Sequence, residues 1–137
     1  MAKVSMNTSL NVSPEKLWEM IGGFNALPDW HPAVEKSELE EEGSVRRLSL
    51  AGGGTIIEKL EKIDDNERLY SYTIVDSPLP VANYTSTIRV KDDGSGNSTV
   101  EWSSEFSPKD VPENDAVEAI QGIYQAGFDN LKKIFGG

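Results

Sequence analysis

The fold is decided by the last segment of the chain, residues 110–135, which reads DVPENDAVEAIQGIYQAGFDNLKKIF. Its apolar residues recur at steps of three or four, which is the spacing of one face of an α-helix. Acidic residues gather near its start and lysines near its end, in the arrangement that complements a helix dipole. A helix of roughly 25 residues is about 37 Å long, so this one can cross a whole sheet. Its apolar stripe is Val117, Ile120, Tyr124, Phe128, Leu131 and Phe135.

The start of this helix and the glycine at position 127 allow two further predictions. Asp110 and Glu113 have the spacing of a capping box, with Pro112 in the first turn of the helix. Gly127 lies on the apolar stripe, where glycine costs about 1 kcal/mol relative to alanine. We therefore expect that either a strand or a ligand approaches the helix closely at Gly127.

The chain before this helix divides into short segments. Polar and apolar residues alternate over residues 4–12, which predicts a strand. Ser13-Pro14-Glu15 has the sequence of a helix start, and this helix is expected to end at Gly22-Gly23. The two prolines of residues 24–32 limit that segment to a short helical turn. Six strands are then predicted between residues 34 and 106, with turns near residues 43, 52–54, 64–66, 78–80 and 92–97.

The order of these segments predicts the fold class. Seven strands joined by short connections favour an antiparallel sheet, and one long helix can cover one face of a curved sheet. The expected fold is α+β, with two short helices between the first two strands and a potential cavity between helix and sheet. We expect a single domain over residues 1–137.

Composition excludes several classes of partner. The chain has 137 residues and a net charge of −10, so a phosphate backbone or an anionic membrane surface would repel it. It contains no cysteine, which excludes disulfides and a cysteine nucleophile. No stretch approaches the ~18 apolar residues of a membrane span. We expect a cytoplasmic protein that binds no nucleic acid, does not insert into membranes, and is a monomer or a weak homodimer.

Few motifs of catalytic or metal chemistry are present. His31 is the only histidine, and no G-x-S-x-G sequence surrounds any serine. The carboxylates show no metal-ligand spacing, and the run Gly52–Gly54 lacks the Lys-Ser/Thr of a phosphate loop. We therefore expect no metal and no cofactor.

The inner faces of the strands are the richest source of candidate site residues. Period-two alternation predicts that each strand turns one set of side chains inward. These sets are Tyr70, Tyr72 and Ile74; Tyr84, Ser86, Ile88 and Val90; and Val100, Trp102, Ser104 and Phe106.

Two charged residues fall on inward faces. Arg46 shares its face with Leu48 and Leu50, and Glu58 alternates in the same way with Ile56 and Leu60. Burying an unpaired charge costs several kcal/mol. Arg46 and Glu58 are therefore expected either to form an ion pair near a sheet end or to line a wet cavity, where they meet polar groups of a ligand.

These residues resemble a known family. The order of elements resembles the polyketide cyclase/dehydrase and lipid-transport group of the START-like, helix-grip (SRPBCC) superfamily. The motifs that carry this resemblance are Ser13-Pro14 through Trp18, Ile21-Gly22, Leu27-Pro28 and Trp30-His31-Pro32. A second set of motifs is more distantly similar to the plant abscisic-acid receptors of that superfamily. This set is Gly43-Ser44-Val45-Arg46, Glu58-Lys59-Leu60 with Asp64-Asp65, Tyr72, and Asn83-Tyr84-Thr85-Ser86.

The resemblance implies a deep cavity between the C-terminal helix and the sheet, which relatives use to hold apolar or amphipathic molecules. It implies cavity positions at Arg46, Glu58, Tyr72, Tyr84, Ser86, Trp102, Ile123 and Gly127, with Lys36 a looser match. The loop at residues 51–55 and the sequence Ser77-Pro78-Leu79-Pro80 depart from the receptors' gate and latch. Hormone reception therefore does not carry over, although both loops are candidates for controlling access of a ligand.

Three functions remain open. The favoured one is a protein that binds a lipid-like, polyketide-like or aromatic molecule. An acid/base enzyme of the cyclase or dehydratase type would use Glu58 or His31 in the cavity, and a protein-interaction module would use the surface. The candidate ligand-binding residues are Lys36, Arg46, Leu48, Glu58, Tyr70, Tyr72, Tyr84, Ser86, Trp102, Phe106, Ile120, Ile123, Tyr124 and Gly127.

Overall fold

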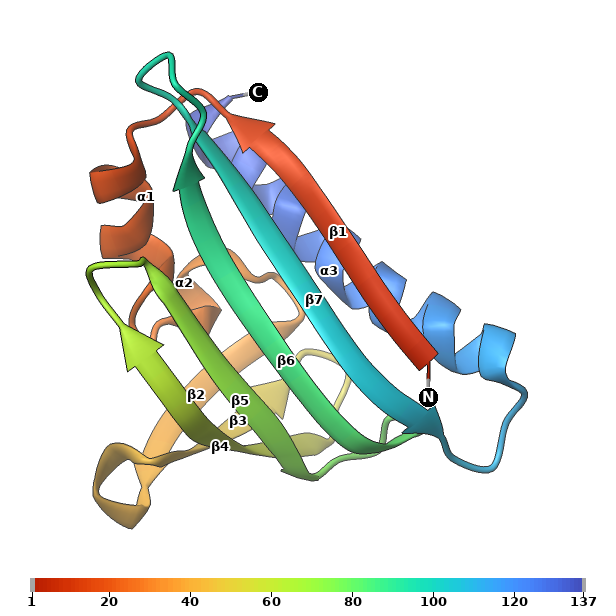
Figure 1. Cartoon of the computed structure of the whole chain (residues 1–137). Coiled ribbons are helices and arrows are strands. Elements are labelled where there is room, and N and C mark those ends of the chain that lie inside the picture. Colours follow the sequence, from red (N-terminus) through yellow and green to blue (C-terminus); the bar gives the residue numbers. More distant parts are fainter. Residues whose placement is uncertain (1, 137) are drawn as a thin grey trace.

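One antiparallel sheet and one long helix make up most of residues 2–136, the part of the chain that a computed structural model describes (Figure 1). The strands are β1 (Ala2–Leu10), β2 (Val34–Glu40), β3 (Val45–Leu50), β4 (Thr55–Asp64), β5 (Leu69–Asp76), β6 (Val81–Asp92) and β7 (Ser98–Pro108). The helices are α1 (Pro14–Ile21), α2 (Leu27–Trp30) and α3 (Glu113–Phe135), with a 3₁₀ turn, η1, at Glu41–Gly43. The predicted α+β class and the order of the helices and strands are confirmed.

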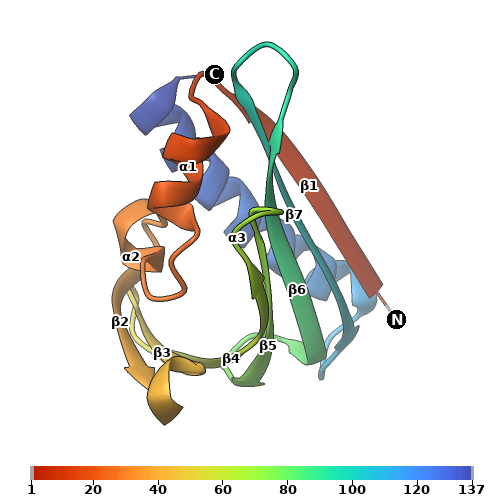
Figure 2. The same cartoon turned by 60° about the vertical axis from the view of Figure 1, so that its left-hand side comes forward.

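The sheet is curved, and α3 lies on its concave side. The strand order is β1-β7-β6-β5-β4-β3-β2, with every neighbouring pair antiparallel. Figure 2 shows the strands β2 to β5 bending around the space beneath α3, and α2 contacts that helix. This arrangement has the curved antiparallel sheet and covering helix that the order of segments predicted, and it is the helix-grip fold that the family resemblance implied.

Both predicted short helices are present, and the first begins as the sequence predicted. Pro14 occupies the first turn of α1, and the Ser13 hydroxyl accepts a hydrogen bond from the Lys16 amide at 3.3 Å. The helix ends at Gly22, whose amide donates to the Trp18 carbonyl. α2 is a single turn that contacts β2 and α3, so it closes one end of the curved sheet.

The start of α3 differs from the prediction. The helix begins at Glu113 with Pro112 at the N-cap, and no side chain caps it. Proline carries no side-chain oxygen, so it cannot accept from the first helical amides. Asp110 lies two residues further out with a φ of 61°, and the predicted capping box between Asp110 and Glu113 is therefore wrong.

Trp102 holds α3 against the sheet. Its indole stacks on the Tyr124 ring, with centroids 4.2 Å apart and planes 16° apart. The rings of Trp30 and His31, from the α2 region, pack against the same indole at 5.4 and 6.1 Å. β7, α2 and α3 therefore meet at one aromatic cluster, which consists of Trp30, His31, Trp102, Tyr124 and Phe128.

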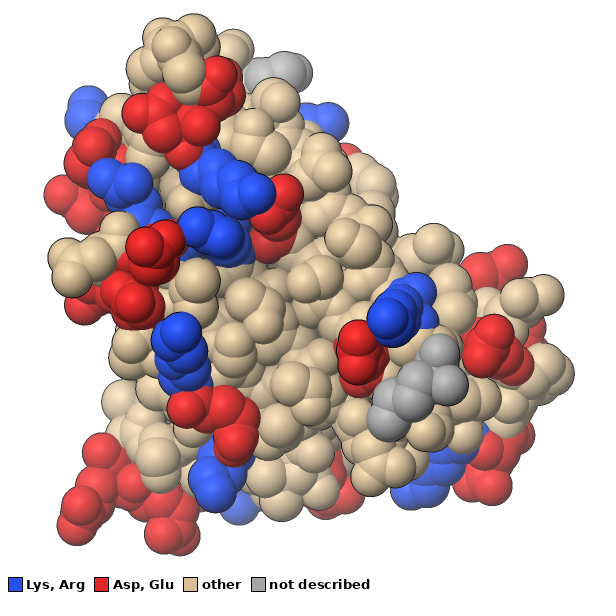
Figure 3. All heavy atoms as spheres, viewed as in Figure 1, with Lys and Arg blue, Asp and Glu red and all other residues tan. Residues whose placement is uncertain are grey.

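The outer face of the sheet carries several ion pairs. Figure 3 shows basic and acidic side chains side by side on this face. Three of the pairs are Lys3–Glu105, Lys91–Glu101 and Arg89–Glu67, with N–O distances between 2.9 and 3.4 Å. Among residues 2–136, no helix is both long and apolar enough to span a bilayer.

The two glycines inside α3 have opposite surroundings, which makes them a matched pair for a stability test. A Cβ at the exposed Gly122 would meet no atom within 4 Å. At Gly127 it would lie 3.0 Å from ring atoms of both His31 and Trp30. Gly122→Ala should therefore stabilise the protein by about 1 kcal/mol.

Gly127→Ala should instead destabilise the protein by about 1–3 kcal/mol, because the added methyl group overpacks the aromatic cluster. Urea unfolding of both variants measures these changes. Equal stabilisation by the two substitutions would contradict the close packing at Gly127.

Candidate functional site

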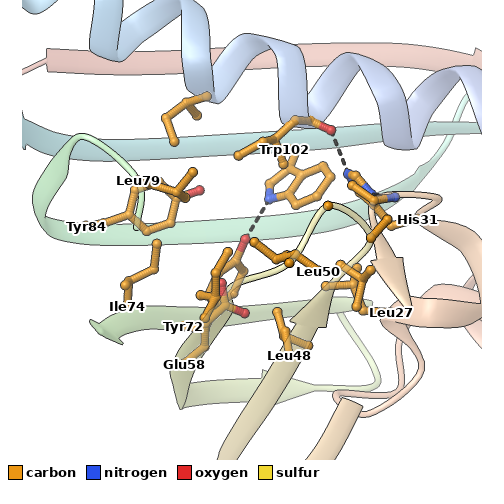
Figure 4. Close-up of a pocket in the computed structure, with 18 residues that line it drawn as sticks. Leu27, His31, Leu48, Leu50, Glu58, Tyr72, Ile74, Leu79, Tyr84 and Trp102 are labelled. Atoms are coloured by element: carbon orange, nitrogen blue, oxygen red, sulfur yellow. Dashed lines mark hydrogen bonds between the residues drawn. The ribbon is translucent and has the colours of Figure 1, made fainter. Parts of the chain in front are cut away.

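A cavity of about 330 Å³ lies between α3 and the inner face of the sheet. It is lined by residues from β2 to β7, from α2 and the turn that follows it, from α3, and from the loop between β3 and β4 and the loop between β5 and β6. Figure 4 shows the side chains converging on it. Its aliphatic lining consists of Leu27, Val34, Leu48, Leu50, Ile56, Ile74, Leu79, Ile120 and Ile123.

Two loops lie beside each other at the cavity. The β3–β4 loop contributes Gly52 and Gly53 to the lining, and the β5–β6 loop contributes Leu79. A Cβ placed on Gly54 would lie 3.6 Å from Pro78 of the other loop. Gly53 and Gly54 have φ values of 93° and 99°, which glycine adopts without strain. The two loops therefore lie close together, and one of them depends on glycine for its shape.

A buried ion pair joins β3 to β4 beside the cavity. Arg46 is opposite Glu58 in the strand register, and its Nε and Nη2 atoms both lie 2.7 Å from Glu58 Oε1. The two side chains are 1% and 7% exposed. Of the two arrangements that the sequence left open, the direct pair is the one formed, and Glu58 also lines the cavity.

Arg46 has further partners on the side away from the cavity. Its Nη1 donates to the Phe24 carbonyl at 2.6 Å, and its guanidinium lies over the Phe24 ring at 4.3 Å. It also lies near Tyr70, whose hydroxyl is 3.4 Å from Nη1. These contacts satisfy the buried guanidinium and link β3 to the segment between α1 and α2.

Glu58 presents an acceptor to the cavity. Both Arg46 contacts fall on Oε1, and no group within residues 2–136 donates to Oε2. Burial raises the pKa of the Glu58 carboxyl, while the charge and hydrogen bond of Arg46 oppose that rise. The Glu58 carboxylate is therefore a hydrogen-bond acceptor at the edge of the apolar cavity, and Arg46 holds it in position.

Hydroxyl groups form a second polar feature of the cavity wall. The Trp102 indole donates from Nε1 to the Tyr72 hydroxyl at 3.0 Å and to Ser86 Oγ at 3.1 Å. The Tyr124 hydroxyl lies 3.0 Å from Ser86 Oγ and 2.5 Å from the Tyr84 hydroxyl. Burial raises the pKa of Tyr72, Tyr84 and Tyr124 above the usual value for a phenol, so all three are neutral near pH 7.

Both nitrogens of His31 are engaged. Nε2 lies 2.7 Å from the Ile123 carbonyl of α3, and Nδ1 accepts from the Ala33 amide at 3.2 Å. Because a carbonyl only accepts, Nε2 carries the proton and the ring is neutral. His31 therefore ties the α2–β2 connection to α3, and neither nitrogen is free to act as a general base.

His31 should make stability depend on pH. Burial lowers its pKa below 6.5, although the bond to Ile123 opposes this. The unfolded chain therefore takes up a proton at a higher pH than the folded chain does. The stabilisation is complete above about pH 6.5 and is lost as the pH falls towards the folded-state pKa.

The test compares wild type with His31→Gln, which keeps a donor but does not titrate. Urea unfolding between pH 7.5 and 5 should show a steeper loss of stability for wild type. Parallel pH profiles for the two proteins would show that His31 does not contribute.

The structure divides the predicted site residues into three groups. Those that line the cavity are His31, Leu48, Glu58, Tyr72, Tyr84, Trp102, Ile120 and Ile123. Those packed behind this lining are Arg46, Tyr70, Ser86, Phe106, Tyr124 and Gly127. Lys36 lies outside the cavity, where it is exposed and pairs with Glu38 at 3.0 Å.

The surroundings of Gly127 differ from both expectations for it. The groups that come closest are the rings of His31, Trp30 and Trp102, rather than a strand backbone or the cavity. These aromatic side chains are the reason that the helix requires a small residue there.

Several lining residues were not among the predicted site residues. Leu50, Ile56 and Ile74 follow the same period-two alternation as the predicted ones, so this signal could have found them. Ala51, Gly52, Gly53 and Leu79 belong to loops, where no periodicity indicates which side chains face inward. Within residues 2–136, no three histidine or acidic side chains lie close enough together to hold a metal ion.

Comparison with known proteins identifies the family. The model of the family "Polyketide cyclase / dehydrase and lipid transport" matches residues 1–136. The chain belongs to this family. The resemblance inferred from the sequence motifs is thereby confirmed.

Three known proteins are similar to this chain in sequence or in fold. Protein XoxI of Bacillus cereus superposes with a TM-score of 0.96 at 46% identity, covering 98% of this chain and 96% of that one. A START superfamily protein of Mycobacterium smegmatis has a TM-score of 0.80 at 15% identity, covering 97% and 96% of the two chains, and shares the fold. The abscisic acid receptor PYL10 of Arabidopsis thaliana is 26% identical over 129 residues, which cover 86% of this chain and 70% of the receptor.

Proposed function

We propose that this protein binds an apolar or amphipathic small molecule in the cavity between α3 and the sheet. The observation that carries this proposal is the lining, which is almost entirely aliphatic and aromatic but includes the carboxylate of Glu58. The cavity volume of about 330 Å³ falls in the range of small-molecule pockets, ~300–1,000 Å³. Apolar surface lining such a space is stabilised when a ligand replaces water there.

The site is organised before any ligand arrives. Glu58 is held by Arg46, and Tyr72 is held by Trp102. Fixed polar groups lose little conformational entropy on binding, which favours affinity. Membership of a family described by polyketide cyclisation and lipid transport agrees with an apolar or amphipathic ligand.

The geometry favours binding over acid/base catalysis. Glu58 is the carboxylate that lines the cavity, and although burial raises its pKa, the ion pair with Arg46 opposes that rise and favours the charged form. His31 has both nitrogens in hydrogen bonds to backbone groups. The two acid/base candidates thus serve to hold the cavity in shape, and a cyclase-type enzyme is the second candidate function.

A matched pair of substitutions on α3 tests the proposal. Ile123 lines the cavity, whereas Ile134 is 43% exposed on the same helix and lies outside the cavity. Ile123→Trp should weaken binding of the neutral fluorophore N-phenyl-1-naphthylamine at least tenfold, because the larger indole occupies the space that the probe needs. Fluorescence titration measures the dissociation constants.

Ile134→Trp is the control and should bind the probe as wild type does. Equal affinities for Ile123→Trp, Ile134→Trp and wild type would place the probe elsewhere. A folded wild type that binds no probe at tens of micromolar would refute the proposed function.

A further inference from the structure

The donor and the acceptor of each hydrogen bond in the cavity wall can be assigned, beginning with Ser86. Its hydroxyl donates to the Ser103 carbonyl at 2.9 Å, because a carbonyl can only accept. A serine hydroxyl has one hydrogen. Ser86 can therefore only accept from its two other neighbours, Trp102 Nε1 at 3.1 Å and the Tyr124 hydroxyl at 3.0 Å.

The same reasoning assigns the donor in the bond between Tyr84 and Tyr124. Tyr124 also has a single hydroxyl hydrogen, and it points to Ser86. The contact between the hydroxyls of Tyr84 and Tyr124 must then be a donation by Tyr84. With its hydrogen engaged, the Tyr84 oxygen can offer the cavity only its remaining acceptor capacity.

Tyr72 has the opposite hydrogen-bonding role, because its own hydrogen remains available for donation. An indole N–H is only a donor, so Tyr72 accepts from Trp102 and keeps its own hydrogen. No group among residues 2–136 accepts that hydrogen. The rings of Tyr72 and Tyr84 are neighbours, with centroids 6.2 Å apart, and both line the cavity (Figure 4).

We propose that the cavity selects neutral, apolar hydroxy-ketones, with Tyr72 donating to the ligand's carbonyl oxygen and Tyr84 accepting from its hydroxyl group. This inference rests on the proposed function and specifies the class of ligand. Glu58 Oε2 is a further acceptor beside Tyr72, and the positive charge of Arg46 is already paired with Glu58. A ligand carboxylate would therefore meet negative charge without a free cation, which disfavours anionic ligands.

The experiment uses three probes of one shape. 2-Acetylnaphthalene offers a carbonyl acceptor, 2-naphthol offers a hydroxyl donor, and 2-methylnaphthalene offers neither. Their affinities are measured by displacement of N-phenyl-1-naphthylamine from wild type, Tyr72→Phe and Tyr84→Phe. Each substitution removes one hydroxyl but keeps the ring, and both leave the Trp102–Ser86 bond in place.

The expected effects are specific to each pair. Tyr72→Phe should weaken binding of 2-acetylnaphthalene about tenfold, the effect of losing one hydrogen bond to a buried group. Tyr84→Phe should weaken binding of 2-naphthol by a similar factor. Tyr84→Phe should bind 2-acetylnaphthalene, and both variants should bind 2-methylnaphthalene, within about twofold of wild type. Wild type should bind both polar probes more tightly than 2-methylnaphthalene.

The possible failures are distinguishable. A reversed pattern, an equal loss for all three probes in either variant, or unchanged binding of the matching probe would overturn the proposed direction while leaving the cavity a binding site. Wild type that binds none of the probes, N-phenyl-1-naphthylamine included, would refute the proposed function together with this inference.

Discussion

The indole of Trp102 is the contact on which the structure depends. It stacks on Tyr124 of α3 and packs against His31 from the α2–β2 connection. Gly127 allows this approach, because an added Cβ would lie 3.2 Å from the indole. On its other edge, the indole N–H donates to Tyr72 in the cavity wall. One side chain therefore fixes the position of the helix over the sheet and the polarity of the wall beneath it.

This arrangement explains why a space remains beneath α3. The aromatic cluster occupies the part of the concave face next to α2, and the side chains further along, such as Ile120 and Ile123, border the cavity. The strands β3 and β4 close the far side, held together by Arg46 and Glu58. The buried pair satisfies both charges without a ligand, and it adds a carboxylate to the hydroxyl groups of the cavity wall.

Much of this organisation could be predicted from the sequence, because it depends on periodicity. Alternation placed Arg46 and Glu58 on the inner face, and the helical stripe identified Ile120 and Tyr124. The capping box failed because Pro112 occupies the N-cap, a local choice that spacing alone does not reveal.

Features that depend on contacts between distant segments could not be predicted from the sequence. Position 127 requires glycine because aromatic rings from distant segments pack against it. Leu79 lines the cavity but belongs to a loop with no periodic pattern. Both nitrogens of His31 proved to be engaged, which only the positions of Ala33 and Ile123 reveal. The direction of the hydroxyl chain likewise follows from one backbone carbonyl that no motif marks.

The central claim is that a small molecule occupies the space beneath α3. An NMR titration of ¹⁵N-labelled protein with N-phenyl-1-naphthylamine tests it most directly, because Trp102 lies at the cavity whereas the Trp18 indole bonds to Asp65 outside it. The account predicts large shifts of the Trp102 indole N–H and of the Gly52 and Gly53 amides, with the Trp18 indole unchanged. Shifts centred on Trp18 or on the outer face of the sheet, or no shifts at all, would contradict it.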